Sequence, residues 1–314
     1  MISYSQAVVI GLLQGVTELF PVSSLGHSVL LPALLGWNDV LRDQSAQESP
    51  YLAFLVGLHV ATALALLVFF RADWARILRG LRRSAARRRV ETADERLGWL
   101  LLAGTIPAGL VGLAFEHTLR TLFAKPLAAA VFLTANGAIL LAGERLRRRA
   151  DARGPRPGTP AGRGDRTGAT AGAPSRTAPP RPAATGVRRL ASLTLGEAVQ
   201  IGSAQILAFF AGISRSGVTM VAGLLRGLDH EDAARFSFLL ATPIILAAGV
   251  YKLPDLLGPN GDGVRGQVLL GSLAAGVAAY LSVRFLTRWF TTRTLTPFAV
   301  YCLVVGIACI ARFA

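Results

Sequence analysis

Two stretches of the chain share a pattern from which the fold can be worked out. Residues 10–27 are IGLLQGVTELFPVSSLGH, and residues 201–217 are IGSAQILAFFAGISRSG. Ile-Gly-x-x-Gln opens both stretches and Ser-x-x-Gly follows in both, with every match 191 residues apart. One spacing shared by five positions predicts two halves of related structure.

Both stretches are apolar but contain residues that interrupt a helix. Pro21 and the serines after it break the first stretch, and the Gly-Ile-Ser-Arg-Ser-Gly sequence breaks the second. Irregular backbone at membrane depth is tolerated only where protein or a water-filled cavity satisfies its polar groups. We therefore expect segments 5–35 and 195–226 to form re-entrant helix–loop–helix hairpins that dip to the middle of a membrane.

The rest of the composition is that of a polytopic membrane protein. Of 314 residues, 52% are apolar and 16% are charged, and mean hydropathy is +0.48. These values argue against a soluble globular enzyme, a disordered chain and a coiled coil. Six apolar runs approach the roughly 20 residues that cross a bilayer. These runs are 53–70, 97–115, 127–143, 237–253, 267–284 and 295–311. The sequence thus predicts an all-α membrane protein with six transmembrane helices and two re-entrant hairpins.

Positive charge is concentrated beside the apolar runs. The formal net charge is +15. Residues 71–96 contain nine arginines and four acidic residues, and residues 144–189 contain twelve arginines and three acidic residues. Arginine-rich segments next to spans are typical of cytoplasmic loops, so both are placed inside the cell. We expect no nucleic-acid binding, because no groove-reading motif accompanies the charge.

The second basic segment divides the chain. Residues 150–187 consist mainly of Arg, Gly, Pro, Thr and Ala, and we expect them to be a disordered cytoplasmic linker. The linker separates a first membrane half, 1–149, from a second half, 188–314. In each half three spans follow the hairpin, and an odd number of spans gives the two halves opposite orientations. The sequence therefore predicts an inverted repeat with its functional site where the hairpins meet.

The first hairpin carries a cluster of polar side chains. Gln14 and Glu18 lie four residues apart, so a helix projects both from one face. The break that follows supplies Ser23, Ser24, Gly26 and His27. Ionisable side chains inside a membrane are costly, which makes them candidates for function. The alternative is a capping serine beside a buried histidine with a structural role.

The second hairpin carries an arginine. Arg215 is flanked by Ser214, Ser216 and Gly217 within an apolar region, and it needs a counter-charge. Glu18 is one candidate and a bound anion is another, since guanidinium groups bind phosphate oxygens in pairs. A purely structural ion pair is the alternative. A hydroxyl, an imidazole, a carboxylate and a guanidinium together suit phosphoryl transfer on a substrate whose tail lies in lipid.

These motifs resemble the undecaprenyl-diphosphate phosphatase family of the bacitracin-resistance type. The resemblance rests on Gln14-x-x-x-Glu18, on PVSSLGH at 21–27 and on GISRSG at 212–217, in that order. It implies an enzyme of the bacterial cell membrane that hydrolyses undecaprenyl diphosphate to undecaprenyl phosphate and inorganic phosphate. This reaction would recycle the lipid carrier for peptidoglycan and other cell-wall glycans and confer bacitracin resistance.

The resemblance also implies roles for single residues. Glu18 would hold a metal or assist proton transfer, Ser24 would be the nucleophile or orient the diphosphate, and His27 would be the acid/base partner. Arg215 would clamp the phosphates. Further substrate-binding residues would be Gln14, Ser23, Gly26, Ser214, Ser216 and Gly217. The implied cofactor is a divalent cation, Mg²⁺ or Ca²⁺, with Glu18 and Gln14 as its ligands. Gln14 stands where many members have Glu, which weakens any mechanism that requires two carboxylates.

The resemblance and the arginine counts together place the site toward the periplasmic or outer side of the membrane. The expected partners are the prenyl diphosphate and membrane lipids, and the sequence leaves a homodimer among the open assemblies. Other ionisable residues are expected outside the chemistry. His59 would pack or line the cavity, His117 and His230 would be solvated at span ends, and Glu197 would be a helix-start charge.

Two other functions remain open at this stage. A transporter or flippase of prenyl phosphates would also use inverted repeats and broken helices. A structural partner in a cell-wall complex would leave Glu18 and Arg215 unexplained. The pair of Ser24 and His27 favours the enzyme, because a flippase needs neither a nucleophile nor a base. The sequence does not separate attack by Ser24 from attack by water.

Overall fold

The computed structural model describes residues 2–314 except 38–39, 41–49, 124, 153–189 and 259–262. Within these residues the chain forms eleven α-helices and two short 3₁₀ helices. The first half contains α1 (Tyr4–Thr17), α2 (Ser24–Leu35), α4 (Pro50–Phe69), α5 (Arg71–Arg87), α6 (Ala93–Phe123) and α7 (Pro126–Ala152). The second half contains η1 (Leu190–Ser192), α8 (Leu195–Ser203), η2 (Ala204–Phe209), α9 (Arg215–Leu225), α10 (His230–Leu257), α11 (Arg265–Trp289) and α12 (Thr296–Phe313).

Long apolar helices confirm the all-α membrane class. By length and composition, α6, α7, α10, α11 and α12 could each cross a membrane. Helix α4 with α5 is a sixth candidate, bent by 85° between the two helices. The six predicted spans fall on α4, α6, α7, α10, α11 and α12.

The first basic segment differs from the loop that its charge suggested. Most of it is helix α5, which buries Ile77, Gly80 and Ser84 on one face. That face packs on α6, where Trp99 Nε1 donates to Ser84 Oγ at 2.8 Å. The arginines occupy the other faces of the helix, so an amphipathic pattern allows a strongly charged segment to be ordered. The first three residues of the predicted linker, 150–152, are the end of helix α7. Residues 153–187 lie outside the described part.

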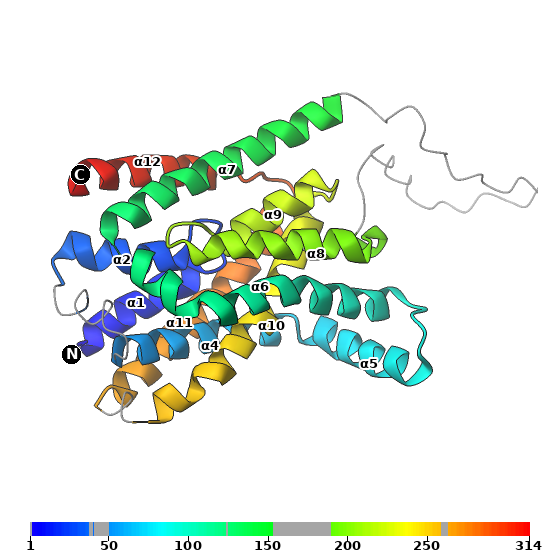
Figure 1. The fold of residues 1–314 in the computed structure, drawn as a ribbon, viewed down its shortest axis with the longest axis horizontal. Helices are drawn as coiled ribbons and strands as arrows, with labels where there is room; N and C mark the ends of the chain where they lie inside the picture. The colour runs from blue at the N-terminus through cyan, green and yellow to red at the C-terminus, as the bar shows by residue number, and fades with distance from the viewer. Residues whose placement is uncertain (1, 38–39, 41–49, 124, 153–189, 259–262) are drawn as a thin grey trace, which may run out of the picture.

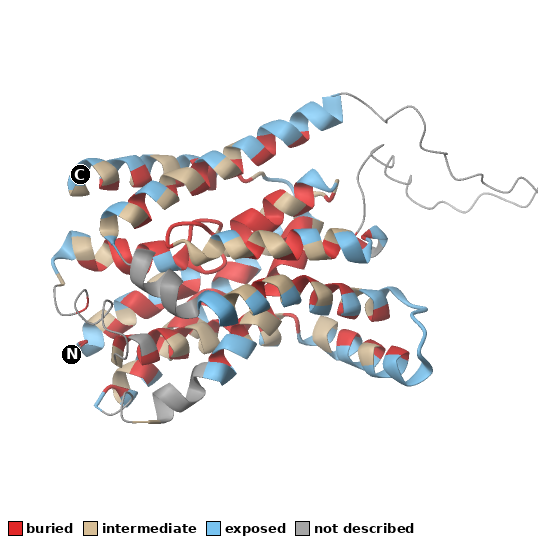
Figure 2. Ribbon diagram, in the orientation of Figure 1, coloured by how far each residue is buried: buried red, intermediate tan, exposed pale blue. Residues whose placement is uncertain are grey.

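Each predicted hairpin consists of short helices with an irregular break between them. Helices α1, α2 and α9 have 14, 12 and 11 residues. At about 1.5 Å per residue they are shorter than the roughly 30 Å hydrocarbon core. The breaks, residues 18–23 and 210–214, are largely buried and lie at the centre of the bundle (Figure 2). Any function of these breaks is therefore carried out inside the protein.

Capping boxes fix where the hairpins begin. Ser3 and Gln6 form one before α1, and Thr194 and Glu197 form another before α8. In each box the side chain of the first residue accepts from the third helical N–H, and the Glu or Gln returns a bond to the cap. The prediction that Glu197 is a helix-start charge is confirmed. Both boxes stand 191 residues apart, like the matched residues in the sequence.

Glycines allow each hairpin to pack closely on a helix of the other half. Gly11 of α1 lies against Gly271 of α11, and Gly202 of α8 lies against Gly104 of α6. A Cβ atom on Gly11 or Gly202 would overlap the facing carbonyl oxygen. The first half therefore contacts the second through α1 and α11, and the second contacts the first through α8 and α6.

Gly202→Ala is expected to destabilise the protein, because the added methyl meets backbone that cannot rotate away. Overpacking of this kind costs about 1–3 kcal/mol. Gly196→Ala in the same helix is the control, since a Cβ there meets nothing within 4 Å; it should be neutral or stabilise by up to ~1 kcal/mol. Unfolding of the purified protein in detergent measures both. Equal melting temperatures for the two variants would contradict the packing described.

The two ends of the bundle differ in character. Both chain termini lie at one end, whereas α5 and the C-terminal end of α7 lie at the other (Figure 1). Helix α7 ends in the sequence Arg-Leu-Arg-Arg-Arg-Ala-Asp-Ala, and α5 contains six arginines and one acidic residue, Asp73. Positive charge is thus gathered at the end opposite the termini.

Candidate active site

The two breaks meet through direct hydrogen bonds. Ser23 Oγ in the first break accepts from the Gly212 N–H of the second at 3.2 Å. The hydroxyls of Ser214 and Ser216 donate to the Phe20 carbonyl at 3.4 and 3.3 Å. Gly212 has φ +117°, a conformation that glycine adopts readily and other residues rarely do. The predicted meeting of the hairpins is therefore observed.

Helices α2 and α9 begin in the same way at this junction. Ser23 Oγ accepts from Gly26 N–H, and Ser214 Oγ accepts from Gly217 N–H, both at 3.2 Å. Ser23 holds this cap with φ 71°, which is uncommon outside glycine. Both helices thus direct their N-terminal ends toward the junction. The positive ends of two helix dipoles make it a favourable place for an anion.

Glu18 is the centre of the polar cluster. The side chain is buried, and its Oε2 accepts hydrogen bonds from Ser24 Oγ and, at 3.1 Å, from Gln14 Nε2. Its Oε1 pairs with Arg215 Nη2 at 2.7 Å. Four residues predicted for the site, from both halves of the chain, are therefore in one connected group.

Arg215 has an unused donor. Its Nη2 is bonded to Glu18, but its Nη1 is buried and has no hydrogen-bond partner among the described residues. A buried donor without a partner is costly, so this atom is available to bind a ligand or a water molecule. A guanidinium that donates to a carboxylate on one side and has a free N–H group on the other is suited to bind an oxyanion.

His27 is placed differently from the expectation. Its Nδ1 donates to the Ser23 carbonyl at 2.6 Å, and its Nε2 lies 2.8 Å from Tyr301 Oη. The His27 and Tyr301 rings are stacked, with centroids 5.7 Å apart. Both ring nitrogens therefore face groups other than Ser24, and the partner of the Ser24 hydroxyl is Glu18. The sequence could not reveal this, because Tyr301 comes from the distant helix α12.

Comparison with known proteins identifies the family of this chain. The model of the family "Bacitracin resistance protein BacA" matches residues 7–308. The chain belongs to this family. A relative from Frankia alni, named undecaprenyl-diphosphatase 2, is 60% identical over 338 aligned residues, which cover 100% of this chain and 98% of the relative.

Other BacA relatives carry the same activity in their names. An undecaprenyl-diphosphatase from Mycolicibacterium paratuberculosis is 60% identical over 307 residues, which cover 97% of this chain and 95% of the relative. One from Granulibacter bethesdensis is 44% identical over 310 residues, which cover 98% and 95%. The similarity therefore extends over both halves and both breaks.

The polar cluster also borders a histidine that was not expected to take part in the chemistry. His59 on α4 has its Nδ1 2.8 Å from the Leu55 carbonyl, which can only accept, so this nitrogen carries the proton. Its Nε2 lies 3.6 Å from Glu18 Oε2. The imidazole thus borders the cluster from a helix outside both hairpins. A histidine within an apolar run was the available signal.

The two other histidines lie away from the site. His230 was expected in solvent, but its Nε2 is 2.7 Å from Glu144 Oε1, which also accepts from Leu295 N–H at 2.7 Å. The expectation was wrong because Glu144 is buried and requires donors. The side chain of His117 lies outside the described residues.

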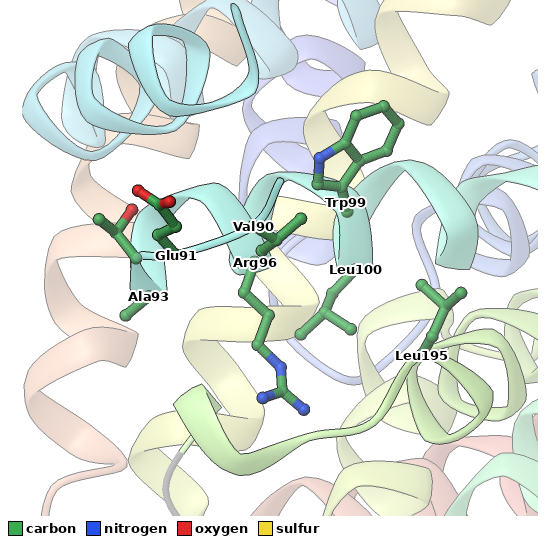
Figure 3. Close-up of a pocket in the computed structure, with 8 residues that line it drawn as sticks. Val90, Glu91, Ala93, Arg96, Trp99, Leu100 and Leu195 are labelled. Carbon is green, nitrogen blue, oxygen red and sulfur yellow. The ribbon is translucent and has the colours of Figure 1, made fainter. Parts of the chain in front are cut away.

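A cavity of about 670 Å³ lies between the α5–α6 turn, α6 and the start of α8 (Figure 3). Its lining comes from residues 90–100 and Leu195, and it includes none of the predicted site residues. Its cation, Arg96, donates from Nε and Nη2 to the Leu193 carbonyl at 3.1 and 2.7 Å. The predicted site residues gather instead at the junction of the breaks.

Proposed function

We propose that the chain is an undecaprenyl-diphosphatase, which hydrolyses undecaprenyl diphosphate to undecaprenyl phosphate and inorganic phosphate. The observation that carries this proposal is the pair of bonds on Glu18. One holds Arg215 with a donor still free, and the other orients the Ser24 hydroxyl. Phosphoryl transfer needs a positioned nucleophile, a proton acceptor and a cationic clamp, and this cluster contains all three.

Substrate binding follows from the unused donor. Arg215 Nη1 would bind a diphosphate oxygen, and the N-terminal ends of α2 and α9 would add favourable dipoles. The prenyl chain would remain among the apolar helices. The negative charge of the diphosphate would thereby be balanced without leaving the bundle.

The chemical step would begin at Ser24. Its Oγ attacks the terminal phosphorus while Glu18 accepts the hydroxyl proton, and the bond from that phosphorus to the bridging oxygen breaks. The bond's electron pair leaves with undecaprenyl phosphate. The leaving undecaprenyl phosphate takes up the proton from Glu18. Water then attacks the phosphorus of the phosphoserine, one of its protons returns to Ser24 Oγ, and inorganic phosphate leaves, so both side chains regain their starting state. In this scheme His27 supports the first turn of α2 through its bonds to Ser23 and Tyr301.

Ser24→Ala tests this scheme. The rate of phosphate release from undecaprenyl diphosphate by the purified protein in detergent should fall by at least ~10²-fold, since the nucleophile is lost. Ser203→Ala is the matched control, because the Ser203 hydroxyl donates only to Val199 of its own helix at 2.8 Å. A Ser24→Ala protein that works at the parent rate would rule out serine attack, and a parent that releases no phosphate would rule out the enzyme.

A divalent cation fits the site if oxygens of the substrate complete its ligand set. Among the described residues no group of three His, Cys, Asp or Glu side chains could hold a metal. Mg²⁺ in phosphate sites, however, is often held by one or two carboxylates together with the substrate's own oxygens. Glu18 and the Gln14 amide oxygen could supply the protein's share. A bound Mg²⁺ or Ca²⁺ would neutralise negative charge on the diphosphate.

Removal of divalent cations should therefore lower the rate of phosphate release. The measurement is the rate in excess chelator, followed by addition of Mg²⁺ or Ca²⁺ in separate samples. Restoration by either ion supports the cation. A rate that stays unchanged in chelator would show that Arg215 and the helix ends balance the charge without a metal.

The membrane arrangement that we propose is an inverted repeat with two re-entrant hairpins. This proposal is supported by residues 191 positions apart that make the same kind of contact in the two halves. The helix caps Ser23 and Ser214 have the same bonds, and Gly11 and Gly202 have the same packing. The end with the arginines would face the cytoplasm, with both termini and the site toward the outer side.

A further inference from the structure

Asn136 connects both breaks to a third element. It lies on α7, outside the two hairpins, and its side chain is fully buried. Its Nδ2 donates to the Pro21 carbonyl of the first break at 3.0 Å. Its Oδ1 accepts from the Ser214 N–H of the second break, also at 3.0 Å. One amide group thus bonds the backbone of both halves.

The orientation of this amide is fixed by its partners. The Pro21 carbonyl can only accept and the Ser214 N–H can only donate, so the nitrogen and oxygen of Asn136 cannot be exchanged. An ionised aspartate of the same size would accept from Ser214 but could not donate to Pro21. Alanine would leave both backbone groups without this partner. Asparagine therefore meets a double requirement that its near-isosteres fail.

The bonded atoms lie next to the reacting groups. Pro21 is three residues from both Glu18 and Ser24, and Ser214 directly precedes Arg215. Hydrogen bonds between the breaks also join them, but those bonds link one irregular segment to another. Asn136 instead holds both segments to α7, a long helix that packs on α2, α9 and α12. Its amide thus fixes the positions of both breaks relative to the same helix.

We propose that Asn136 is a positioning residue for the hydrolysis. It holds Ser24 and Arg215 at the separation that a diphosphate requires, through backbone bonds and without touching the substrate. This inference rests on the proposed function. Misplacement of reacting groups by about 1 Å can cost on the order of 10²-fold in rate, so the effect should be large.

The experiment compares Asn136→Asp and Asn136→Ala with the parent, as full-length proteins in detergent. For both variants kcat for phosphate release should fall by roughly 10²-fold, with KM changed by less than about 3-fold, because alignment is lost but the Arg215 donor remains. Thr242→Val is the matched control. Thr242 is equally buried and bonds only to Phe238 of its own helix, at 3.3 Å, so kcat should stay within about 2-fold.

A double variant separates positioning from a general loss of structure. In an Arg215→Lys background, Asn136→Asp should cost less than about 5-fold, because the alignment that it disturbs is already impaired. A full 10²-fold loss in that background, or an Asn136→Asp protein with the parent kcat, would overturn the inference while the parent enzyme remains active. A parent without phosphate release would instead overturn the proposed function, and this inference with it.

Discussion

Replacement of Arg215 by alanine is expected to lower phosphate release from undecaprenyl diphosphate by roughly 10³-fold or more, the range measured for arginines that stabilise phosphoryl transfer. The reason is twofold. The variant removes the only described donor that is buried at the junction without a partner, and it leaves Glu18 without its counter-charge. The measurement is kcat/KM of the purified protein in detergent.

Two further variants define what Arg215 contributes. Arg215→Lys keeps the positive charge but loses the planar pair of donors, so its activity should lie between those of the parent and the alanine variant. Arg284→Ala is the control, because Arg284 is exposed on α11 and outside the cluster. If lysine restored the full rate, the charge alone would be sufficient, and the argument from the free Nη1 atom would be wrong.

Glu18→Gln should abolish activity and also destabilise the fold. The amide cannot accept the Ser24 proton, which removes a contribution of roughly 10²–10⁴-fold in rate. It also leaves the Arg215 guanidinium, whose Nη1 is buried, without an opposite charge. Breaking a fully buried pair costs about 3–5 kcal/mol, and the cost here should be lower because the Arg215 side chain is 15% exposed. The readouts are phosphate release and the unfolding midpoint in detergent.

The two effects of Glu18→Gln can be separated by a second substitution. The double variant Glu18→Gln with Arg215→Met has no unpaired charge, so it should unfold at a higher temperature than Glu18→Gln alone and remain inactive. Glu231→Gln, an exposed position in the first turn of α10, should change neither property. Parent-like stability in the Glu18→Gln protein would mean that Arg215 finds its counter-charge elsewhere.

The sequence could predict the helices that cross the membrane and the place where function lies. Hydropathy over about 20 residues is a local property, so six runs were enough to locate the six long or bent helices. The repeated Ile-Gly-x-x-Gln and Ser-x-x-Gly patterns located both breaks, because caps and close glycine contacts depend on residue type. The cost of an unpaired charge in an apolar region made Glu18 one of two candidate counter-charges for Arg215, the other being a bound anion.

Contacts between distant helices could not be predicted in the same way. Tyr301 faces His27 and His59 borders Glu18 only because α12 and α4 pack beside the hairpins. Nothing in the local sequence fixes those neighbours. Asn136 is different, since a polar amide in the middle of the apolar run 127–143 is itself a signal that it has buried partners. Which partners it has required the packing of α7 against both breaks.

The close packing of α1 on α11 has a consequence for biosynthesis. A ribosome completes Gly11 long before Gly271, which follows 260 positions later in the chain. Until α11 has been synthesised, the glycine face of α1 lacks its packing partner. Until Arg215 has been synthesised, the Glu18 carboxylate lacks its ion-pair partner. The nascent N-terminal portion must therefore be inserted in a provisional form, and a competent catalyst exists only once the final helices have emerged.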